Sequence, residues 1–280
     1  PNCDISLTYH KSSNMLRCHY CGYATKRKEL CPKCHEEFKD YGIGTEKVEE
    51  ELNKLITNAK TIRMDVDTTT TKNAHEKIIN SFLEEKYNIL VGTQMIAKGL
   101  DFPNVTLVGV LNADISLNFP DFRSSETTFS LLNQVLGRSG RGNKEGKVLI
   151  QTFNPEHYAI AYTKNHDYLG FYNEEMKIRK ILKYPPYYYI CSIKIISKDY
   201  NLASKSSYGV VNYLKQNIKN EIILGPSVCN VFKLNNNYRF QIIIKYKDVN
   251  NILEYLTNIE HHYFNKKDIK VEIDFNPLKL

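Results

Sequence analysis

The sequence predicts an α/β protein in three parts: a cysteine-rich region over residues 1–40, a lobe with a parallel sheet over 41–181, and an α+β, ferredoxin-like domain over 182–280. Five of the seven cysteines fall within the first part, which suits a small unit held by metal. From residue 41 apolar strands alternate with helices, a pattern typical of a mostly parallel sheet. The last part has the order strand, helix, two strands, helix, strand, which predicts a ferredoxin-like sandwich.

Composition sets limits on the class of protein. With 280 residues and 42% hydrophobic side chains, the chain can form two domains and a small appendage. It has no apolar run long enough to cross a bilayer, so no membrane span is expected. Cysteines arranged as Cys-x-x-Cys favour metal binding in a reducing cytoplasm over a disulfide framework, and a cytoplasmic location is therefore expected.

The net charge of +7 is unevenly placed. Residues 1–181 hold 24 basic and 23 acidic side chains, whereas residues 182–280 hold 14 and 8. The excess in the last part favours a polyanionic partner such as DNA, because neutralised phosphates release counterions. A solvated lysine surface explains the same charge equally well.

The cysteine-rich region contains Cys18-x-x-Cys21 and Cys31-x-x-Cys34. Such paired turns present four thiolates to a tetrahedral zinc, so zinc binding is predicted. Cys3 is a fifth candidate: either the two pairs share one metal and Cys3 is not a ligand, or the cysteines belong to two sites. Histidines beside cysteines are more often polar surface than ligands. Three lie close enough in the sequence to complete a site: His10, His19 and His35.

The lobe begins with a loop, Gly42–Glu46, in which Thr45 is a good helix N-cap with an acid next to it. Val48, Leu52 and Leu55 then form the apolar stripe of a helix. Hydrophobic spacing predicts the other elements. Strands are expected over 61–66, 87–93, 105–111 and 146–152, and helices over 73–85, 127–136 and 157–182.

The last predicted helix of the lobe ends before Tyr184-Pro-Pro-Tyr187, because a residue that precedes proline disfavours the helical region. The C-terminal domain follows this segment. Its strands are expected over 188–196, 228–234, 240–246 and 269–275, and its helices over 201–218 and 250–259.

Two motifs of the lobe carry its chemistry. A Gly-x-Asp loop, Gly99 to Asp101, follows an apolar strand, and Gln134-x-x-Gly-Arg138-x-x-Arg141 comes about thirty residues later. This order is typical of the RecA-like second motor lobe of a superfamily 2 helicase. Arg138 and Arg141 would then stabilise charge on a transferred γ-phosphoryl group as arginine fingers. Either arginine alone would be explained better as a solvated side chain on a glycine-rich turn.

Half of an ATPase is absent from the sequence. It contains no Gly-x-x-x-x-Gly-Lys-Ser/Thr loop and no strand that ends in an Asp-Glu pair for magnesium. The opening Pro1-Asn2-Cys3 resembles the tail of a Cys-x-x-Cys pair. We therefore expect the C-terminal piece of a longer protein, in which ATP and magnesium bind with a missing lobe, and a fragment that alone does not hydrolyse ATP.

Together these features resemble the C-terminal portion of the PriA (primosomal protein N′) family of replication-restart helicases, over essentially the whole chain. The segments that carry the resemblance are Gly44–Glu46, Arg63–Thr68, Leu90–Lys98, Asp101–Val105, Pro120–Arg123, Gln134–Arg141 and Tyr184–Pro186. The family implies a 3′ to 5′ ATP-dependent DNA helicase that acts at stalled forks and directs reloading of the replicative helicase. The implied partners are forked or single-stranded DNA, other primosome proteins and single-stranded DNA-binding protein. Near the C-terminus the family tends to show Asp-x-Asp-Pro, whereas Asn276 replaces the second acid here.

The resemblance also implies a ligand set for two zinc ions. Cys3, Cys18 and Cys21 would belong to one site, and Cys31 and Cys34 to the other. Three cysteines upstream of this chain would complete the two sites, so at least one site is expected to be incomplete here.

Further residues are candidates for ligand contacts. Gly99 and Asp101 would face the ribose or nucleotide edge, and Gln134 would join the network between motor lobes. Helix N-termini offer free N–H groups to phosphates, so the candidates for the DNA backbone are Gly44, Thr45, Thr93 and Gln94. In the C-terminal domain, Arg239 and three tyrosines could grip DNA, although packing within the sheet is the more common role of a tyrosine. These tyrosines are Tyr187, Tyr188 and Tyr238.

Two rival hypotheses remain at this stage. The first is a non-catalytic module in which zinc-binding turns and a ferredoxin-like domain form a docking platform for DNA or proteins. The second is another superfamily 2 motor, such as a branch-migrating recombination helicase, but its lack of a zinc insertion conflicts with the cysteines. The sequence upstream would separate all three.

Overall fold

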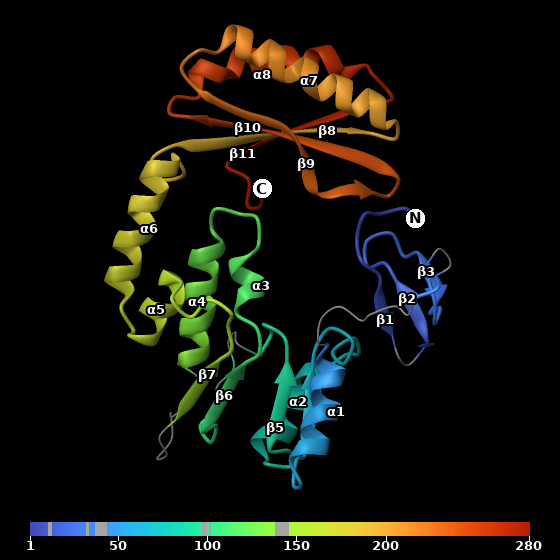
Figure 1. The fold of residues 1–280 in the computed structure, drawn as a ribbon, viewed down its shortest axis with the longest axis vertical. Coiled ribbons are helices and arrows are strands. Elements are labelled where there is room, and N and C mark those ends of the chain that lie inside the picture. The colour runs from blue at the N-terminus through green and yellow to red at the C-terminus, as the bar shows by residue number, and fades with distance from the viewer. Residues whose placement is uncertain (11–12, 32–33, 37–43, 97–99, 101, 138–145) are drawn as a thin grey trace. The chain divides into compact units, whose positions relative to one another are not determined.

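The computed structural model describes residues 1–10, 13–31, 34–36, 44–96, 100, 102–137 and 146–280 (Figure 1). The chain divides into two compact units, each treated by itself below. One unit comprises Pro1–Phe38, Pro120–Phe122 and Glu175–Leu280, and the other comprises Lys39–Phe119 and Arg123–Glu174. Among the described residues, no helix has the length and apolar character needed to cross a bilayer.

The C-terminal domain is a four-stranded antiparallel sheet with two helices on one face (Figure 1). Its strand order is β11-β8-β10-β9, which is the ferredoxin-like arrangement and confirms the predicted fold. In chain order its elements are β8 (Tyr189–Ser197), α7 (Tyr200–Asn217), β9 (Ile222–Leu234), β10 (Asn237–Tyr246), α8 (Asn250–Phe264) and β11 (Lys270–Phe275).

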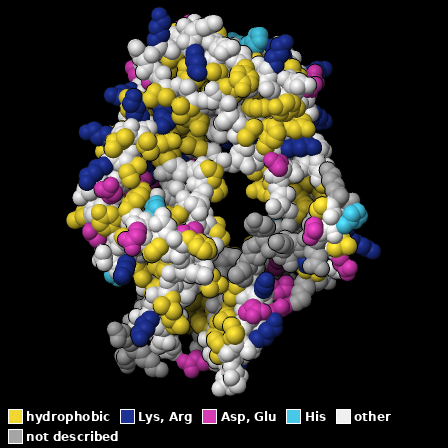
Figure 2. Space-filling view, in the orientation of Figure 1, with side chains coloured by type: hydrophobic (Ala, Val, Ile, Leu, Met, Phe, Trp, Pro, Cys, Tyr) yellow, Lys and Arg dark blue, Asp and Glu magenta, His cyan; other side chains and the backbone are white. Residues whose placement is uncertain are grey.

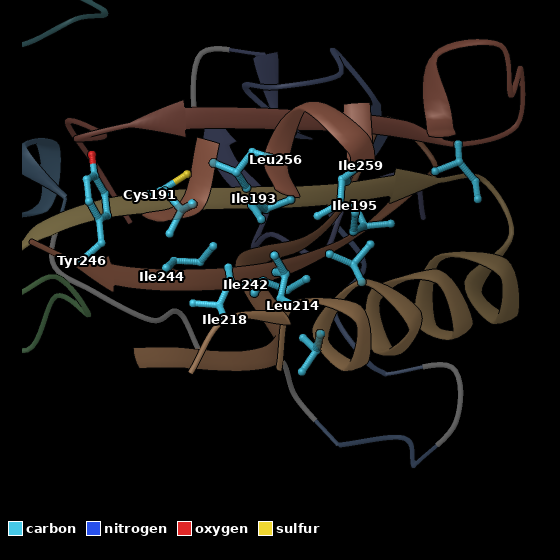
Figure 3. Close-up of a cluster of buried hydrophobic side chains, with 14 residues drawn as sticks. Cys191, Ile193, Ile195, Leu214, Ile218, Ile242, Ile244, Tyr246, Leu256 and Ile259 are labelled. Atoms are coloured by element: carbon cyan, nitrogen blue, oxygen red, sulfur yellow. The ribbon is translucent and has the colours of Figure 1, made fainter. Parts of the chain in front are cut away.

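The core of this domain lies between the sheet and its two helices. Alternate residues of a strand face the same side, so Ile193 and Ile195 of β8 point to the helices together with Ile242 of β10 (Figure 3). Leu214 of α7 and Leu256 of α8 meet them, and all five are almost fully buried. Burying an aliphatic side chain of this size stabilises a fold by about 1.5–3 kcal/mol.

Strand β9 is longer than the predicted 228–234. The first six residues of β9 were not predicted as strand, because Gly225 and Pro226 are typical of a turn. Proline is tolerated in β9 because this strand lies at the edge of the sheet. Gly225 has φ of 104°, a region that favours glycine, and the register with β10 shifts nearby.

Asn276 has a structural role at the end of β11. Its φ of 52° is left-handed, a conformation that asparagine tolerates. Its N–H donates to the carbonyl oxygen of Ile190 at 2.7 Å, and its side-chain Oδ1 accepts from the N–H of Ile190 at 3.4 Å. The amide at this position therefore ties the end of the chain to β8.

The cysteine-rich region forms a small antiparallel sheet of β1 (Thr8–His10), β2 (Met15–Arg17) and β3 (Ala24–Lys26). The sequence did not predict these strands, because three-residue strands show too little alternation. Among the described residues of this region, Cys18 is the buried hydrophobic side chain. The sheet thus has almost no apolar core of its own.

The lobe contains two parallel pairs of strands, so the predicted parallel pairing is confirmed. β4 (Thr61–Met64) pairs with β5 (Ile89–Gly92), and β6 (Leu107–Val110) pairs with β7 (Lys147–Ile150). Within the described residues these form two separate two-stranded sheets. The helices of the lobe that precede residue 137 are α1 (Thr45–Leu55), α2 (Ala74–Leu83), α3 (Asp114–Leu117) and α4 (Ser124–Leu136).

The segment over 157–182 is helical as predicted, but it is interrupted. The structure has two helices there, α5 (Tyr158–Lys164) and α6 (Tyr168–Leu182). His166 adopts a left-handed φ of 53°, which ends the first helix. Asp167 then accepts the N–H of Gly170 at 2.8 Å and supports the first turn of the second helix.

Candidate functional site

The start of α1 is joined to the end of β4. The prediction that Thr45 is the N-cap is wrong: Gly44 occupies that position, and Thr45 is the first helical residue. The hydroxyl of Thr45 instead donates to Asp65 Oδ2 at 2.6 Å. Because glycine has no side chain, no cap side chain occupies the first N–H groups of the helix.

Asp65 is a buried acid at the centre of this junction. Its Oδ1 accepts the N–H of Thr68 at 2.9 Å, and Arg63 Nε lies 3.7 Å from its Oδ2. Burial works against the charged form, but hydrogen bonds from Thr45 and Thr68 and the charge of Arg63 together lower the pKa of Asp65. Asp65 is therefore a carboxylate that fixes the helix start.

The candidate DNA contacts of the lobe lie at one edge of the β4–β5 pair. Met64 is directly opposite Gly92 in the parallel register, so Asp65 and Thr93 follow the two strands at the same carboxyl edge. Thr93 and Gln94 are both exposed there. A Cβ at Gly92 would collide with the carbonyl oxygen of Met64, so glycine permits this close approach. Carboxyl edges of parallel strands are where ligands bind in α/β folds.

Of the nucleotide candidates, Gln134 is described. It is exposed on α4, three residues before the helix is capped by Gly137. Arg138, Arg141, Gly99 and Asp101 lie outside the described residues.

Three thiols come together in the cysteine-rich region. The sulfur atoms of Cys3, Cys18 and Cys21 lie within 4.8 Å of one another. Backbone N–H groups of Cys21 and Tyr20 donate to the Cys18 thiolate and lower its pKa to about 7. Thiolates at this spacing fit a tetrahedral zinc, and N–H donors to sulfur are usual around such sites.

The thiol of Cys3 has a donor from the C-terminal domain. The N–H of Asn235 donates to Cys3 Sγ at 3.3 Å, which favours the thiolate. Burial and the neighbouring Cys21 and Cys18 outweigh this bond and raise the pKa of Cys3. The structure thus groups Cys3 with Cys18 and Cys21, as the resemblance implies.

Cys31 and Cys34 are not part of this cluster as far as the described residues extend. They nevertheless begin a turn like the first one. The N–H of Cys18 donates to the carbonyl oxygen of Tyr23, and the carbonyl oxygen of Cys18 accepts the N–H of Gly22. In the same way, the N–H of Cys31 donates to the carbonyl oxygen of residue 36, and its carbonyl oxygen accepts the N–H of residue 35. Gly22 and His35 both have positive φ in these turns. His35 is therefore a turn residue, and no histidine joins the described thiol cluster.

Arg239 lies at a cleft of about 650 Å³ in the C-terminal domain. It is half-buried on β10, opposite Ile196 of β8. Lys198 and Lys267 line the same cleft. Within the described part of the chain, the side chain of Arg239 makes no hydrogen bond and no ion pair. Its guanidinium is therefore available to an anion.

The candidate tyrosines differ in their surroundings. The ring of Tyr238 packs edge-on against Tyr200 at 5.6 Å, so packing explains it. Tyr188 has the ammonium of Lys247 5.2 Å from its ring. Tyr187 is 39% exposed and is the candidate best placed to stack on a base.

Comparison with known proteins covers all three parts. Residues 1–26 match the PriA DNA helicase Cys-rich region domain, 36–143 the helicase conserved C-terminal domain, and 180–278 the primosomal protein N C-terminal domain. The replication restart protein PriA of Bacillus subtilis is 48% identical over 282 residues, which is 99% of this chain and 35% of that protein. The chain belongs to the PriA family. PriA of Borreliella burgdorferi is 39% identical over 100% of this chain and 42% of that protein, and PriA of Synechocystis is 37% identical over 100% and 34%.

The chain thus spans between about a third and two fifths of the length of these PriA relatives. Arg63–Thr68 contributes to the resemblance to PriA, but its sequence predicted no role for Asp65. An aspartate followed three residues later by threonine is a turn signal that could have revealed Asp65. The donor from Asn235 had no such signal, because it joins residues more than two hundred positions apart.

Proposed function

We propose that this chain is the C-terminal part of an ATP-dependent, 3′ to 5′ superfamily 2 DNA helicase that acts in replication restart at stalled forks. The observation that carries the proposal is the order of three matching regions, Cys-rich, helicase and primosomal, along one chain. Its partners would be forked or single-stranded DNA, primosome proteins and single-stranded DNA-binding protein in the cytoplasm.

In this proposal the nucleotide binds between two motor lobes. The other lobe supplies the phosphate loop and the magnesium ligands. This lobe supplies Arg138 and Arg141 to the γ-phosphate and Asp101 to the ribose or nucleotide edge. Gln134, which is exposed on α4, reaches toward the other lobe.

The edge of the β4–β5 pair would hold the DNA backbone. The first N–H groups of α1 and the exposed Thr93 and Gln94 offer donors to phosphate oxygens. Asp65 accepts the hydroxyl of Thr45, so it positions the helix start and does not itself touch the phosphate. Closure of the lobes on ATP and opening after hydrolysis would then move the protein along one strand.

Zinc would have a structural role. Cys3, Cys18 and Cys21 would hold one ion, and a cysteine upstream of this chain would complete its four ligands. Cys31 and Cys34 would contribute to a second ion in the same way. Since the described sheet of this region has almost no apolar core, the metal would supply most of its stability.

The test is ATP hydrolysis with and without forked DNA by this chain, by the full-length protein, and by the full-length protein with Arg141→Ala. We expect hydrolysis only in the full-length protein, stimulation by DNA, and a loss on the order of a thousandfold in the variant. Arg17→Ala is the matched control, because it removes an exposed arginine from β2 and should leave turnover unchanged. An inactive full-length protein, or one indifferent to Arg141, would favour the non-catalytic docking module.

A further inference from the structure

The hairpin that joins β9 and β10 has a tight two-residue turn. Asn235 and Asn236 both have left-handed φ, 50° and 61°, between the paired residues Leu234 and Asn237. Such turns match the twist of a hairpin, and asparagine suits them. The N–H groups of the two central residues do not join the ladder between the strands, so they can donate elsewhere.

This hairpin holds the segment that carries Cys3. Four hydrogen bonds join the two. They are Asn235 N to Cys3 Sγ at 3.3 Å, Asn236 N to Asn2 O at 2.8 Å, Asp4 N to Lys233 O at 2.8 Å and Lys233 Nζ to Pro1 O at 2.9 Å. A backbone N–H that donates to a metal-binding sulfur orients it and tunes its charge. The hairpin is therefore a second layer around the thiol cluster.

The same hairpin also forms a wall of the cleft that contains Arg239. Leu234, Asn235 and Asn237 line this cleft together with residues from the β8–α7 turn and from the segment before β11. Asn235 thus contributes both to the cleft and to the surroundings of Cys3.

Four basic and three acidic side chains line the cleft. Of its acids, Asp199 accepts the N–H of Leu202 as the N-cap of α7, and Glu272 pairs with Lys270 at 2.7 Å. Within the described residues no ion pair engages the remaining cations, which are Lys198, Lys267 and Arg239, or the remaining carboxylates, which are Asp199 and Asp268, so the cleft keeps one positive charge in excess. Figure 2 shows Lys and Arg side chains scattered over this domain, at the top of the view. Such cations suit backbone phosphates of DNA.

We propose that the hairpin is a shared wall, through which metal binding at Cys3, Cys18 and Cys21 sets the affinity of the cleft for the phosphates of a DNA strand. The Cys3 segment has almost no apolar core, so the metal orders it and, through the four hydrogen bonds, orders the hairpin. A wall that is already ordered loses less conformational entropy when DNA binds. The choice of DNA as ligand rests on the proposed function, whereas the link between metal and hairpin does not.

The first test is hydrogen exchange on the full-length protein, with zinc bound and after chelation. Amides of 233–236 should exchange at least about tenfold faster without zinc, while those of β8 and α7 stay protected. Cys18→Ser should have the same effect, because it removes a ligand that does not touch the hairpin; zinc returned to the chelated protein should restore protection. Unchanged exchange at 233–236, or equal loosening of the whole domain, would overturn the proposal.

The second test is binding of an oligo(dT) of about 16 nucleotides. In the zinc-loaded protein, the double variant Lys198→Ala, Lys267→Ala should bind about tenfold more weakly, with a salt dependence reduced by about two charges. The matched control is Lys215→Ala, Lys219→Ala, at the other end of α7, which should bind normally.

Zinc removal should weaken binding by the wild type and the control but not further weaken the Lys198, Lys267 variant. Equal weakening of all three would mean that the metal acts elsewhere and would overturn the proposal. Since oligonucleotide binding needs no ATP, failure of the hydrolysis test alone would remove the helicase assignment and leave this link intact.

Discussion

The C-terminal domain and the motor lobe are stabilised in different ways. The domain has one continuous cluster of fourteen buried residues (Figure 3), whereas the described part of the lobe has two clusters of three buried residues each. Ligand contacts on motors belong to segments that must open and close, and such segments come from the less stable parts of a structure. We therefore expect the C-terminal domain, the scaffold of this comparison, to open locally less readily than the described part of the lobe.

At the carboxyl edge of the β4–β5 pair, the elements of the lobe are joined by polar contacts. There, α1, β4 and the following turn meet at Asp65, which accepts from Thr45 and Thr68. Such a junction is directional, so it can fix the position of a helix start more sharply than apolar packing can. Because the group at its centre is a carboxylate with a lowered pKa, we also expect the junction to weaken in acid.

The largest expected effect tests the scaffold. Leu214→Ala should lower the free energy of unfolding of the C-terminal domain by about 3–5 kcal/mol, because the cavity would lie between α7 and the sheet. Leu253→Ala, at a site that is 47% exposed on α8, should change it by less than about 0.5 kcal/mol. Urea unfolding followed by residue-resolved hydrogen exchange measures both. A loss below about 1 kcal/mol for Leu214→Ala would contradict the single dense core.

The next effect concerns the close approach of β5 to β4. Gly92→Ala should destabilise the lobe by about 1–3 kcal/mol, because the new methyl group would collide with the carbonyl oxygen of Met64. Gly109→Ala is the matched control in β6, where a Cβ would meet nothing within 4 Å. The same urea experiment applies. If both changes were tolerated equally, the backbones of β4 and β5 would have moved apart at little cost. The difference in packing between the lobe and the C-terminal domain would then be larger than expected.

The sequence predicted elements best where periodicity is long. In the C-terminal domain alternating and helical patterns placed all six elements, and the starts of β9 and β10 and the end of α8 were misplaced by three residues or more. The N-cap role of Thr45 was wrong because a tertiary partner, Asp65, took its hydroxyl. The cysteine spacing marked a metal site but left the ligand grouping open; the fold brings Cys3 to the other two thiols, and no local pattern encodes that approach.

Acid should destabilise the lobe at the Asp65 junction, which has no counterpart in the comparison with the core of the C-terminal domain. Because the pKa of Asp65 is lowered in the folded lobe, its stabilising contribution is present above the unfolded value of about 3.9 and is lost as pH falls through the lower folded value. Hydrogen exchange of α1 and β4 should therefore accelerate in acid beyond its intrinsic rate. Asp65→Asn should remove this part of the pH dependence. If the variant kept the full dependence, another carboxylate would be responsible.

The smallest effect isolates one hydrogen bond of the same junction. Thr45→Val removes the hydroxyl that donates to Asp65 while keeping the shape of the side chain, and should destabilise the lobe by about 1 kcal/mol. The loss of this donor also removes a contribution that lowers the pKa of Asp65, so the acid transition should move to higher pH. Thr70→Val is the matched control, because its hydroxyl is exposed and contacts the Asp67 carbonyl at 3.4 Å. An acid transition that stays in place in Thr45→Val would mean that Thr68 and Arg63 alone hold the carboxylate. The hydroxyl of Thr45 would then be available for the proposed contact with the DNA backbone.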